Sequence, residues 1–324
     1  MNNYYYNLLN TYEKQVYQIL KQGIFTYQSH IAIPHYLANV VDVPKLMIFV
    51  GCDHPKLFYV NFYDYHYTLT ASALVIEPYY WYNPNQIAKM DAKIDKLLDN
   101  MVKQVKAPTQ YQTVKNLYEL LTYNVTFQRV NRAERRKKIN ETNTIVGVLF
   151  YKKGMCESIA KTFQMVASLA GINCLVVHGF AGSQNEYHAW NVVQIDGATY
   201  HLDATYAVCE YATLHEMCYD YLNMCDVDVA TTHRPSYPVP RCTATRHNYY
   251  VASNLVATKE ADIRRIVENS TTKTIAFRYE GEFEGHVHKA AQCCSDWIHY
   301  YHKRAKDVKY TYIPAYRICR VSYK

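Results

Sequence analysis

The feature that most constrains this fold is a pair of alternating segments on either side of the dipeptide Asp196-Gly197. Residues 188–195 and 198–203 both alternate between the two faces expected of a half-buried strand. Asp-Gly between two such segments is the strongest short-range signal of a β-hairpin, because both residues of its turn need a positive φ. The sequence therefore predicts an antiparallel hairpin whose register is set by a two-residue turn.

This register brings a histidine and an aspartate to the same face of the hairpin. Asp203 lies opposite Trp190, and His188 lies opposite Thr205. Because side chains repeat every two residues along a strand, His188 and Trp190 share a face. Asp203 is then a diagonal neighbour of His188, about 7–8 Å away at the backbone, a gap that the two side chains can close. A slip of one residue would separate them, so the prediction depends on the turn.

A helix is predicted to begin just after Gly154 and to carry Cys156 at its start. Gly171 is the predicted stop, since glycine commonly follows the last turn of a helix. Residues 172–179 then read as a buried strand. The apolar face of the helix recurs at spacings of three and four; its members are Ile159, Phe163, Val166, Ala167 and Ala170.

Cys156 therefore stands at the positive end of a helix, where unpaired N–H groups favour a thiolate over a thiol. A neighbouring imidazolium strengthens this effect and produces a reactive sulfur. Cys156, His188 and Asp203 together are the parts of an activated thiol nucleophile. The alternative is a small buried side chain that only packs.

Three motifs in this stretch, GMCESIAKTF, EYHAWNVV and DGATYHLDATY, resemble the bacterial transglutaminase-like superfamily. The resemblance implies a papain-like core with the cysteine on a helix and the histidine and aspartate on adjacent strands. It implies that Cys156 is the nucleophile, His188 the general base and acid, and Asp203 the orienting carboxylate. Many members read Cys-Glu-Gly-Tyr-Ala, whereas this chain has Ser158-Ile159 in place of Gly-Tyr. That departure leaves the three reactive residues intact.

Two other histidines are less suited than His188 to act as the base, and the sequence indicates few oxyanion donors. His54 precedes Pro55, which disfavours a helix there, and a turn role is enough to explain it. His201 lies two residues from Asp203 on the same face, so it is the rival imidazole. Papain-like proteases carry a glutamine six residues before the cysteine, where this chain has Phe150. The backbone N–H of Cys156 is the one oxyanion donor that the sequence indicates.

The fold class predicted is α+β, a papain-like or transglutaminase-like core in which the nucleophile helix packs on an antiparallel sheet. The predicted divisions are a β-rich N-terminal extension at 1–84, the catalytic core with a trailing segment at 85–250, and a small α/β subdomain at 251–324. The further helices expected are 4–22, 85–105, 108–124, 259–269 and 286–304, and the further strands are 30–33, 45–50, 57–67, 70–77, 273–279 and 308–322.

The strand expected at 57–67 is unusually rich in tyrosine, in a chain with 34 tyrosines in all. Phe58, Val60 and Phe62 are expected on one face of it, and Tyr59, Tyr63, Tyr65 and Tyr67 on the other. One interpretation is a strand packed on both faces. The other is an exposed tyrosine-rich binding surface, because tyrosine suits interfaces.

Composition limits the classes of protein that this chain can belong to. Its 324 residues are 49% hydrophobic, which indicates a globular protein. We find no signal peptide at the N-terminus and no apolar run of the ~20 residues that span a bilayer, so we expect a cytoplasmic protein without membrane insertion. The ten cysteines are then expected to be reduced.

Metal, cofactor and nucleic-acid roles have little support in the sequence. The chain has no Cys-x-x-Cys pair, so no zinc site and no cofactor are expected; His286 and His288 are minor candidates for metal ligands. The net charge is +7, and its one dense basic run is 129–138. That run is either a solvated segment or a patch for an acidic partner, and no nucleic-acid-binding module accompanies it.

Three functions remain open at this point. The first is a cysteine enzyme that forms a thioester with a peptide or protein amide, and hydrolysis is favoured over amine transfer because nothing in the sequence indicates a site that excludes water. The second is a binding module that has lost turnover, which the Ser158-Ile159 departure would support. The third is an enzyme like the arylamine acetyltransferases, which use the same residue order. The oligomeric state stays open.

Overall fold

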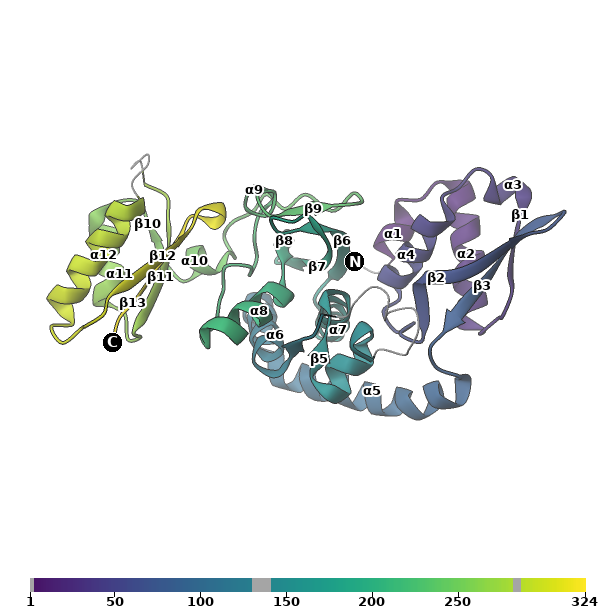
Figure 1. Ribbon diagram of the computed structural model, residues 1–324, viewed down its shortest axis with the longest axis horizontal. Helices are drawn as coiled ribbons and strands as arrows, with labels where there is room; N and C mark the ends of the chain where they lie inside the picture. The colour runs from purple at the N-terminus through teal and green to yellow at the C-terminus, as the bar shows by residue number, and fades with distance from the viewer. Residues whose placement is uncertain (1–2, 130–140, 282–286) are drawn as a thin grey trace.

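The computed structural model describes residues 3–129, 141–281 and 287–324, arranged in three blocks that follow chain order. Figure 1 shows an N-terminal block at one end, a C-terminal block at the other, and between them a core that holds α7 and its sheet. Helices and strands contribute to every block, so the predicted α+β class is confirmed. Among the described residues, no helix has the length and apolar character needed to cross a bilayer.

The N-terminal block packs helices against an antiparallel sheet with the strand order β1-β3-β2. Its interior is continuous with that of the core, since buried side chains of both belong to one hydrophobic cluster. The elements are α1 (Tyr4–Asn7), α2 (Thr11–Phe25), β1 (Ile31–Pro34), α3 (His35–Ala38), α4 (Val43–Asp53), β2 (Val60–Leu69) and β3 (Ala73–Tyr80).

Two predictions for this block are wrong. The single helix expected at 4–22 is divided into α1 and α2, because the Asn10 side chain accepts hydrogen bonds from the backbone of Tyr12 and Glu13 and starts a new helix. The strand expected at 45–50 is helix α4. Asp42 caps this helix by accepting a hydrogen bond from the Lys45 N–H at 3.0 Å. Most residues of the helix are buried, which explains why apolar residues follow one another without the spacing of an amphipathic helix.

The tyrosine-rich strand β2 changes character along its length. Residues 58–62 are all buried, as expected for a strand packed on both faces. The pairing with β3 then shifts between Asn61 and Tyr65, and such a bulge re-aims the side chains that follow it. Beyond it Tyr63 is 46% exposed and Tyr67 is 70% exposed. The first half of this segment is therefore packed on both faces and the second half exposes tyrosines, while a binding role for them stays a prediction.

The core contains a four-stranded antiparallel sheet with the strand order β8-β7-β6-β9. Its hairpin has the predicted register, from Ile195 opposite Ala198 to Asn191 opposite Leu202. The elements are α5 (Pro84–Val105), α6 (Gln110–Asn124), β4 (Thr126–Phe127), β5 (Lys153–Gly154), α7 (Cys156–Leu169), β6 (Cys174–Ala181), β7 (Glu186–Ile195), β8 (Ala198–Leu202), α8 (Ala204–Leu214), α9 (Asp226–Val229), β9 (His233–Pro235) and α10 (Tyr249–Ala252).

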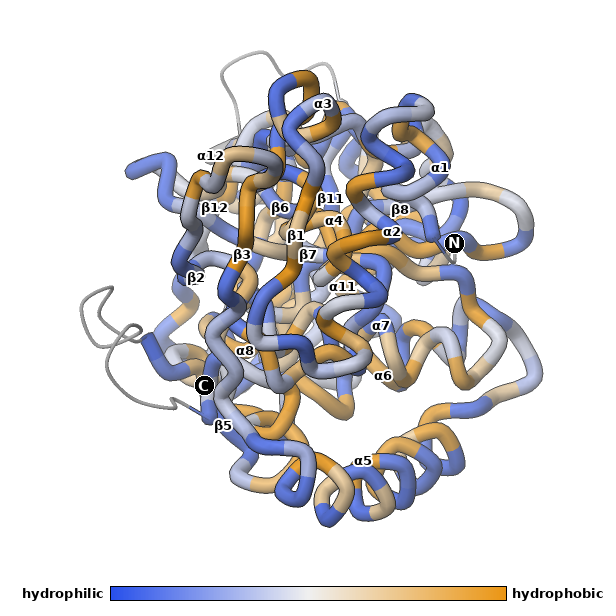
Figure 2. The backbone as a smooth tube through the Cα atoms, turned by 90° about the vertical axis from the view of Figure 1, so that its right-hand side faces the viewer, coloured by the Kyte–Doolittle hydropathy of each residue, from blue (hydrophilic) through white to orange (hydrophobic). Residues whose placement is uncertain are grey.

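Helix α7 is the central helix of the core and packs against strands β6 and β7. Its predicted apolar face is fully buried at Ile159, Phe163 and Val166. The Asn191 side chain in β7 donates a hydrogen bond to the Ala160 carbonyl at 2.9 Å, which fixes the helix on the sheet. Helices α5 and α6 cover its other sides, and in Figure 2 the amphipathic α5 lies at the edge of the molecule with hydrophilic turns outward.

The C-terminal block is a sheet with the strand order β10-β11-β13-β12 covered by two helices. The single strand expected at 308–322 is a hairpin, because a turn at Pro314–Tyr316, followed by Arg317 at φ 56°, reverses the chain. The predicted domain boundaries stay predictions. The elements are β10 (Val256–Ala257), α11 (Glu260–Glu268), β11 (Thr274–Tyr279), α12 (Val287–Tyr301), β12 (Lys309–Ile313) and β13 (Ile318–Ser322).

Candidate active site

Cys156 is the first residue of helix α7, as predicted, and it is half-buried. The turn before it is tight: a Cβ on Gly154 would lie 2.7 Å from the Val148 side chain and 2.9 Å from the Ser158 hydroxyl. The Ser158 hydroxyl accepts a hydrogen bond from the Met155 N–H at 2.9 Å and donates one to the Thr142 carbonyl at 2.7 Å. Ser158 is fully buried, so its polar group is used to hold the start of the helix.

His188 lies on strand β7 between Cys156 and Asp203. Its Nε2 is 2.7 Å from Asp203 Oδ2, so Nδ1 is the ring nitrogen left for the thiol. Burial disfavours its charged form, but the Asp203 carboxylate and the hydrogen bonds to Asp203 and Cys156 raise the pKa of His188 to about 10. The imidazole is therefore an imidazolium at neutral pH and faces the sulfur.

Asp203 is fully buried and accepts four hydrogen bonds. Oδ1 accepts from the backbone N–H groups of Thr205 at 2.8 Å and Tyr206 at 3.2 Å. Oδ2 accepts from His188 and, at 3.0 Å, from His233. Burial by itself would raise the pKa of Asp203, but the nearby His188 charge and these hydrogen bonds hold it well below its usual range. Asp203 is thus a carboxylate with no free lone pair directed at solvent.

One detail of the predicted hairpin is wrong. Strand β8 ends at Leu202, and Asp203 is the N-cap residue of helix α8. Thr205 is therefore in the helix and does not pair with His188 across the sheet. The physical cause is the Asp203 side chain, whose carboxylate satisfies the free N–H groups at the start of α8. The contact between His188 and Asp203 forms nevertheless, because Asp203 still lies beside the end of the strand.

His201, the rival imidazole, is buried and has hydrogen-bond partners of its own. Its Nδ1 accepts a hydrogen bond from Trp190 Nε1 at 3.1 Å. The proton must then be on Nε2, which donates it to Asp226 Oδ1 at 3.1 Å. Both ring nitrogens are used, and His201 is not among the residues that line the cleft of Cys156.

His233 is the residue of this site that sequence reasoning missed. It begins strand β9, pairs with Ala181 of β6, and has a completely buried side chain. It belongs to the segment predicted to trail the catalytic core, and this was the only signal that could have drawn attention to it. Its 30-residue separation from Asp203 gives no register from which the contact could be deduced.

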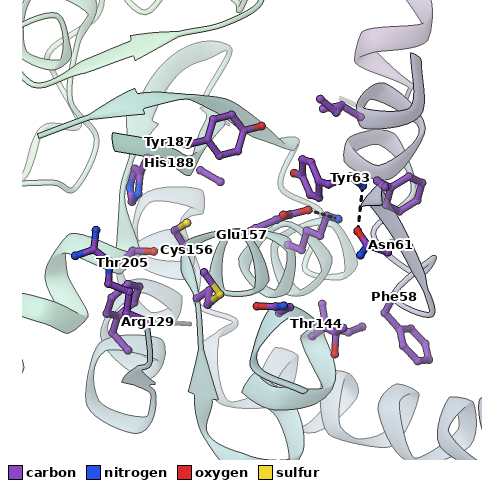
Figure 3. A pocket seen from close by; sticks show the side chains of 18 of the residues that line it. Phe58, Asn61, Tyr63, Arg129, Thr144, Cys156, Glu157, Tyr187, His188 and Thr205 are labelled. Carbon is purple, nitrogen blue, oxygen red and sulfur yellow. Dashed lines mark hydrogen bonds and ion pairs between the residues drawn. The ribbon is translucent and has the colours of Figure 1, made fainter. Parts of the chain in front are cut away.

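A cleft of about 1190 Å³ opens over Cys156. Figure 3 shows the Cys156 side chain between His188 on one side and Glu157 on the other, with Tyr187 and Tyr63 across the cleft. Phe150 does not line the cleft, but Asn143 does, and its buried Oδ1 has no hydrogen-bond partner among the described residues. Asn143 follows Thr142, whose carbonyl holds the start of α7, and it lines the same cleft as Cys156.

Polar side chains of the cleft are paired with one another. Glu157 and Lys161 form an ion pair at 2.6 Å. Burial acts to raise the pKa of Glu157, but Lys161, His178 and Tyr63 together lower it further than burial raises it. Tyr187 donates a hydrogen bond to His178 Nδ1 at 3.0 Å, and burial lowers the pKa of His178 to about 4. The wall beside Cys156 therefore carries balanced charge.

In the part of the chain that the structure describes, two groups of three side chains are close enough to surround a metal ion. One is His188, Asp203 and His233, where both imidazoles already donate to one carboxylate oxygen. The other is His201, Asp226 and Cys242; there the nitrogen that faces Asp226 carries a proton, so metal binding would require an imidazolate. Hydrogen bonding explains both groups. His286 and most of the basic run at 129–138 lie outside the described residues, as does the side chain of His288.

Cys156 is expected to react with iodoacetamide faster than the other nine cysteines at pH 6. Burial raises the pKa of each of those nine thiols, whereas Cys156 stands at a helix N-terminus beside the His188 imidazolium. Tryptic mapping after brief treatment measures the labelling of each cysteine. Even labelling across the ten would contradict an activated thiol at Cys156.

Comparison with known proteins bears on this core. A family model of the transglutaminase-like superfamily matches residues 95–204, which contain Cys156, His188 and Asp203. No curated protein matches the chain in sequence.

Solved structures with similarity include a TGase at 14% identity and TM-score 0.31, where the match covers 44% of each chain. A candidate cysteine protease from Cytophaga hutchinsonii has 18% identity and TM-score 0.29, covering 41% of this chain and 51% of that one. The periplasmic domain of TgpA from Pseudomonas aeruginosa, bound to ethylmercury, has 19% identity and TM-score 0.29, covering 37% and 46%. The chain thus spans about half the length of these proteins, and similarities at this level carry no information on substrate or reaction. The family match thus shows that residues 95–204 are similar to the core of the transglutaminase-like superfamily.

Proposed function

We propose that the protein is a cysteine-dependent acyl-transfer enzyme that forms a thioester between Cys156 and a peptide or protein amide. The observation that carries this proposal is His188, whose imidazole is hydrogen-bonded to the Asp203 carboxylate at 2.7 Å and lies beside the Cys156 side chain in the same cleft. A thiol, an imidazole and a buried carboxylate in this order match the roles of nucleophile, acid–base and orienting group.

The reaction follows from these positions. The Cys156 thiolate attacks the amide carbonyl carbon, and the carbonyl electron pair moves to oxygen, where the N–H groups at the start of α7 can stabilise it. When this intermediate collapses, the C–N bond breaks and the His188 imidazolium gives its proton to the leaving nitrogen. The neutral His188 then takes a proton from the water that attacks the thioester. A carboxylic acid leaves, and the thiolate–imidazolium pair is restored.

Hydrolysis is the favoured outcome because no segment among the described residues covers the site and excludes water from it. The turn before His188, residues 182–186, is polar and exposed, so water can reach the thioester. Tyr63 and Tyr187 do line the cleft, and aromatic rings can hold the ammonium group of an amine acceptor. However, the carboxylate beside them, Glu157, is already neutralised by Lys161, which weakens the attraction for a second cation.

A partition experiment tests both the enzyme and the acceptor. The protein is incubated with a library of glutamine-containing peptides and millimolar Nα-acetyl-lysine, and mass spectrometry quantifies hydrolysed product, aminated product and thioester at Cys156. We expect hydrolysed product to exceed aminated product and the Cys156→Ala variant to form neither. Predominantly aminated product would identify a transferase. Product that persists in the Cys156→Ala variant would contradict the cysteine mechanism.

The binding-module alternative loses its main support in the structure. The Ser158-Ile159 departure was its evidence, yet both side chains are fully buried under the start of α7 and neither lines the cleft. We place the enzyme in the cytoplasm, a proposal supported by ten cysteines that are all free thiols. Its expected partner is a peptide or protein substrate, and nucleic acid is not expected to bind.

A further inference from the structure

The proposed reaction assigns no role to His233, although this residue contacts the carboxylate on which the reaction depends. His233 Nε2 lies 3.0 Å from Asp203 Oδ2, the same oxygen that accepts from His188. The centroids of the two imidazole rings are 5.7 Å apart. The rings of Trp190 and Tyr206 pack against His233 with centroid distances of 5.0 and 5.2 Å. Asp203 is therefore held between two buried histidines.

The hydrogen-bond acceptors around His188 and His233 determine which ring nitrogens carry protons. An ionised carboxylate only accepts hydrogen bonds, so both His188 and His233 carry a proton on the nitrogen that faces Asp203. The other nitrogen of His233 is 2.8 Å from the Thr232 hydroxyl, which is 2.5 Å from the Tyr316 hydroxyl. With His233 neutral, each hydroxyl donates to the next group, from Tyr316 to Thr232 and from Thr232 to His233. Among the described residues, the competing acceptor for the Thr232 hydroxyl is the Val229 carbonyl, at a longer 3.5 Å.

Tyr316 comes from another part of the chain than the catalytic core. It lies in the turn between β12 and β13 of the C-terminal block and is buried. It packs edge-to-face on Tyr221 at 5.3 Å and shares a cluster with Cys218, Met224 and Val229. The hydrogen-bonded chain from Asp203 through His233 and Thr232 thus ends in the C-terminal block.

We propose that His233 is a positioning residue for the Cys156–His188–Asp203 site, and that Thr232 and Tyr316 fix it, so that the C-terminal block completes the active site. The proposal rests on the proposed function. Donation from His233 keeps Asp203 ionised and turned toward His188. Without it, Asp203 is protonated more readily or turns away, and the imidazolium that activates Cys156 is less stable.

The test follows the alkylation of Cys156, which needs no knowledge of the substrate. Rate constants for iodoacetamide are measured from pH 4 to pH 10 in the full-length protein. We expect His233→Leu to lower the rate at pH 6 by about 10–100-fold, the range for the loss of one hydrogen bond to a charged group, and to move the acid side of the profile to higher pH. His233→Gln, whose amide nitrogen can replace Nε2–H, is expected to restore most of both.

His201→Leu is the matched control, because His201 is also buried and hydrogen-bonded to a carboxylate, yet outside the cleft. It is expected to leave the pH profile in place. The titratable groups that face His233 are Asp203, His188, His201, Tyr206 and Tyr316. Since His201→Leu removes one of them without touching Asp203, a shift seen only in His233→Leu reports on the contact with Asp203.

The Tyr316→Phe variant tests the same hydrogen-bonded chain with a smaller change, outside the catalytic core. It removes one hydroxyl and is expected to slow alkylation several-fold in the same direction as His233→Leu. A folded His233→Leu protein with the parent profile would overturn the positioning role, and a Tyr316→Phe protein with the parent profile would overturn the link to the C-terminal block. If the His233→Leu protein does not fold, the pH profiles of His233→Gln and Tyr316→Phe decide whether His233 positions Asp203. The proposed function fails separately, if the parent protein labels Cys156 selectively but turns over no amide.

Discussion

Replacing His188 by alanine is expected to abolish turnover, whereas replacing His201 by alanine only weakens it. His188 is the imidazole that contacts both Cys156 and Asp203, so its loss removes the group that protonates the leaving amine and later activates water. General acid–base groups contribute about 10²–10⁴-fold, and the loss of thiol activation adds to this. His201 has no free nitrogen, because Trp190 and Asp226 occupy both.

The measurement is kcat and KM for both variants on a peptide found in the partition experiment. A fall in kcat with little change in KM is expected for His188→Ala, since the imidazole acts on the transition state rather than on binding. His201→Ala is expected to change kcat by less than about 10-fold through packing beside Trp190. The opposite ranking would mean that His201 is the base and that the observed hydrogen bonds do not describe the working enzyme.

Replacing Asp203 by asparagine is expected to lower both the activity and the stability of the protein by large amounts. An amide can present an N–H to His188 or His233, where both imidazoles need an acceptor, so the network cannot form as it is. Loss of the orienting carboxylate is expected to lower kcat by about 10⁴-fold. Breaking this fully buried contact is expected to cost about 3–5 kcal/mol of unfolding free energy at pH 7.

The pH dependence of stability has a sign that follows from the two pKa shifts. The pKa of Asp203 is lowered in the folded protein, so its charge stabilises the fold above the unfolded value of about 3.9, and this contribution is lost as pH falls toward the folded value. The pKa of His188 is raised to about 10, so its contribution is complete below about pH 6.5 and is lost as pH rises through about 10. The ion pair therefore stabilises the protein most between about pH 4 and pH 7.

Urea unfolding at pH 7 and pH 3 measures the stability effect, with Asp226→Asn as the control. Asp226 also binds a buried histidine, but its side chain is 41% exposed. The difference between parent and Asp203→Asn is expected to shrink from pH 7 to pH 3, while Asp226→Asn stays within about 1 kcal/mol of the parent. A difference independent of pH would show that Asp203 is not charged in the folded protein.

Much of the site could be predicted because its signals are local. The Asp196-Gly197 turn has φ values of 48° and 81°, and such a turn allows one register for the two strands that it joins. Gly154 and Gly171 bracket α7 as expected, with Gly171 at φ 85°. His188 and Asp203 lie on the hairpin and directly after it, so local patterns were sufficient to bring these two together, whereas the place of the Cys156 helix beside them was predicted from the family resemblance.

Predictions of secondary structure failed where a local sequence pattern was compatible with two structures. Residues 45–50 are apolar enough for a buried strand, but a cap at Asp42 and burial on most sides make them part of helix α4. At the end of β8, the same carboxylate that holds His188 also caps α8, so the strand is shorter than its pattern. In the C-terminal block a short turn at Pro314–Tyr316 divides one long alternating run into two strands.

The sequence by itself determined the nucleophile helix, the hairpin register and therefore the contact of His188 with Asp203, because each depends on residues within a few turns of one another. Only the tertiary structure decided what surrounds them. His233 reaches Asp203 across 30 residues, and Tyr316 reaches Thr232 across 84. Tyr63 comes to the cleft from a strand of another block. Contacts at such separations depend on how whole elements pack, and side-chain periodicity within one element carries no information on which distant element will cover it.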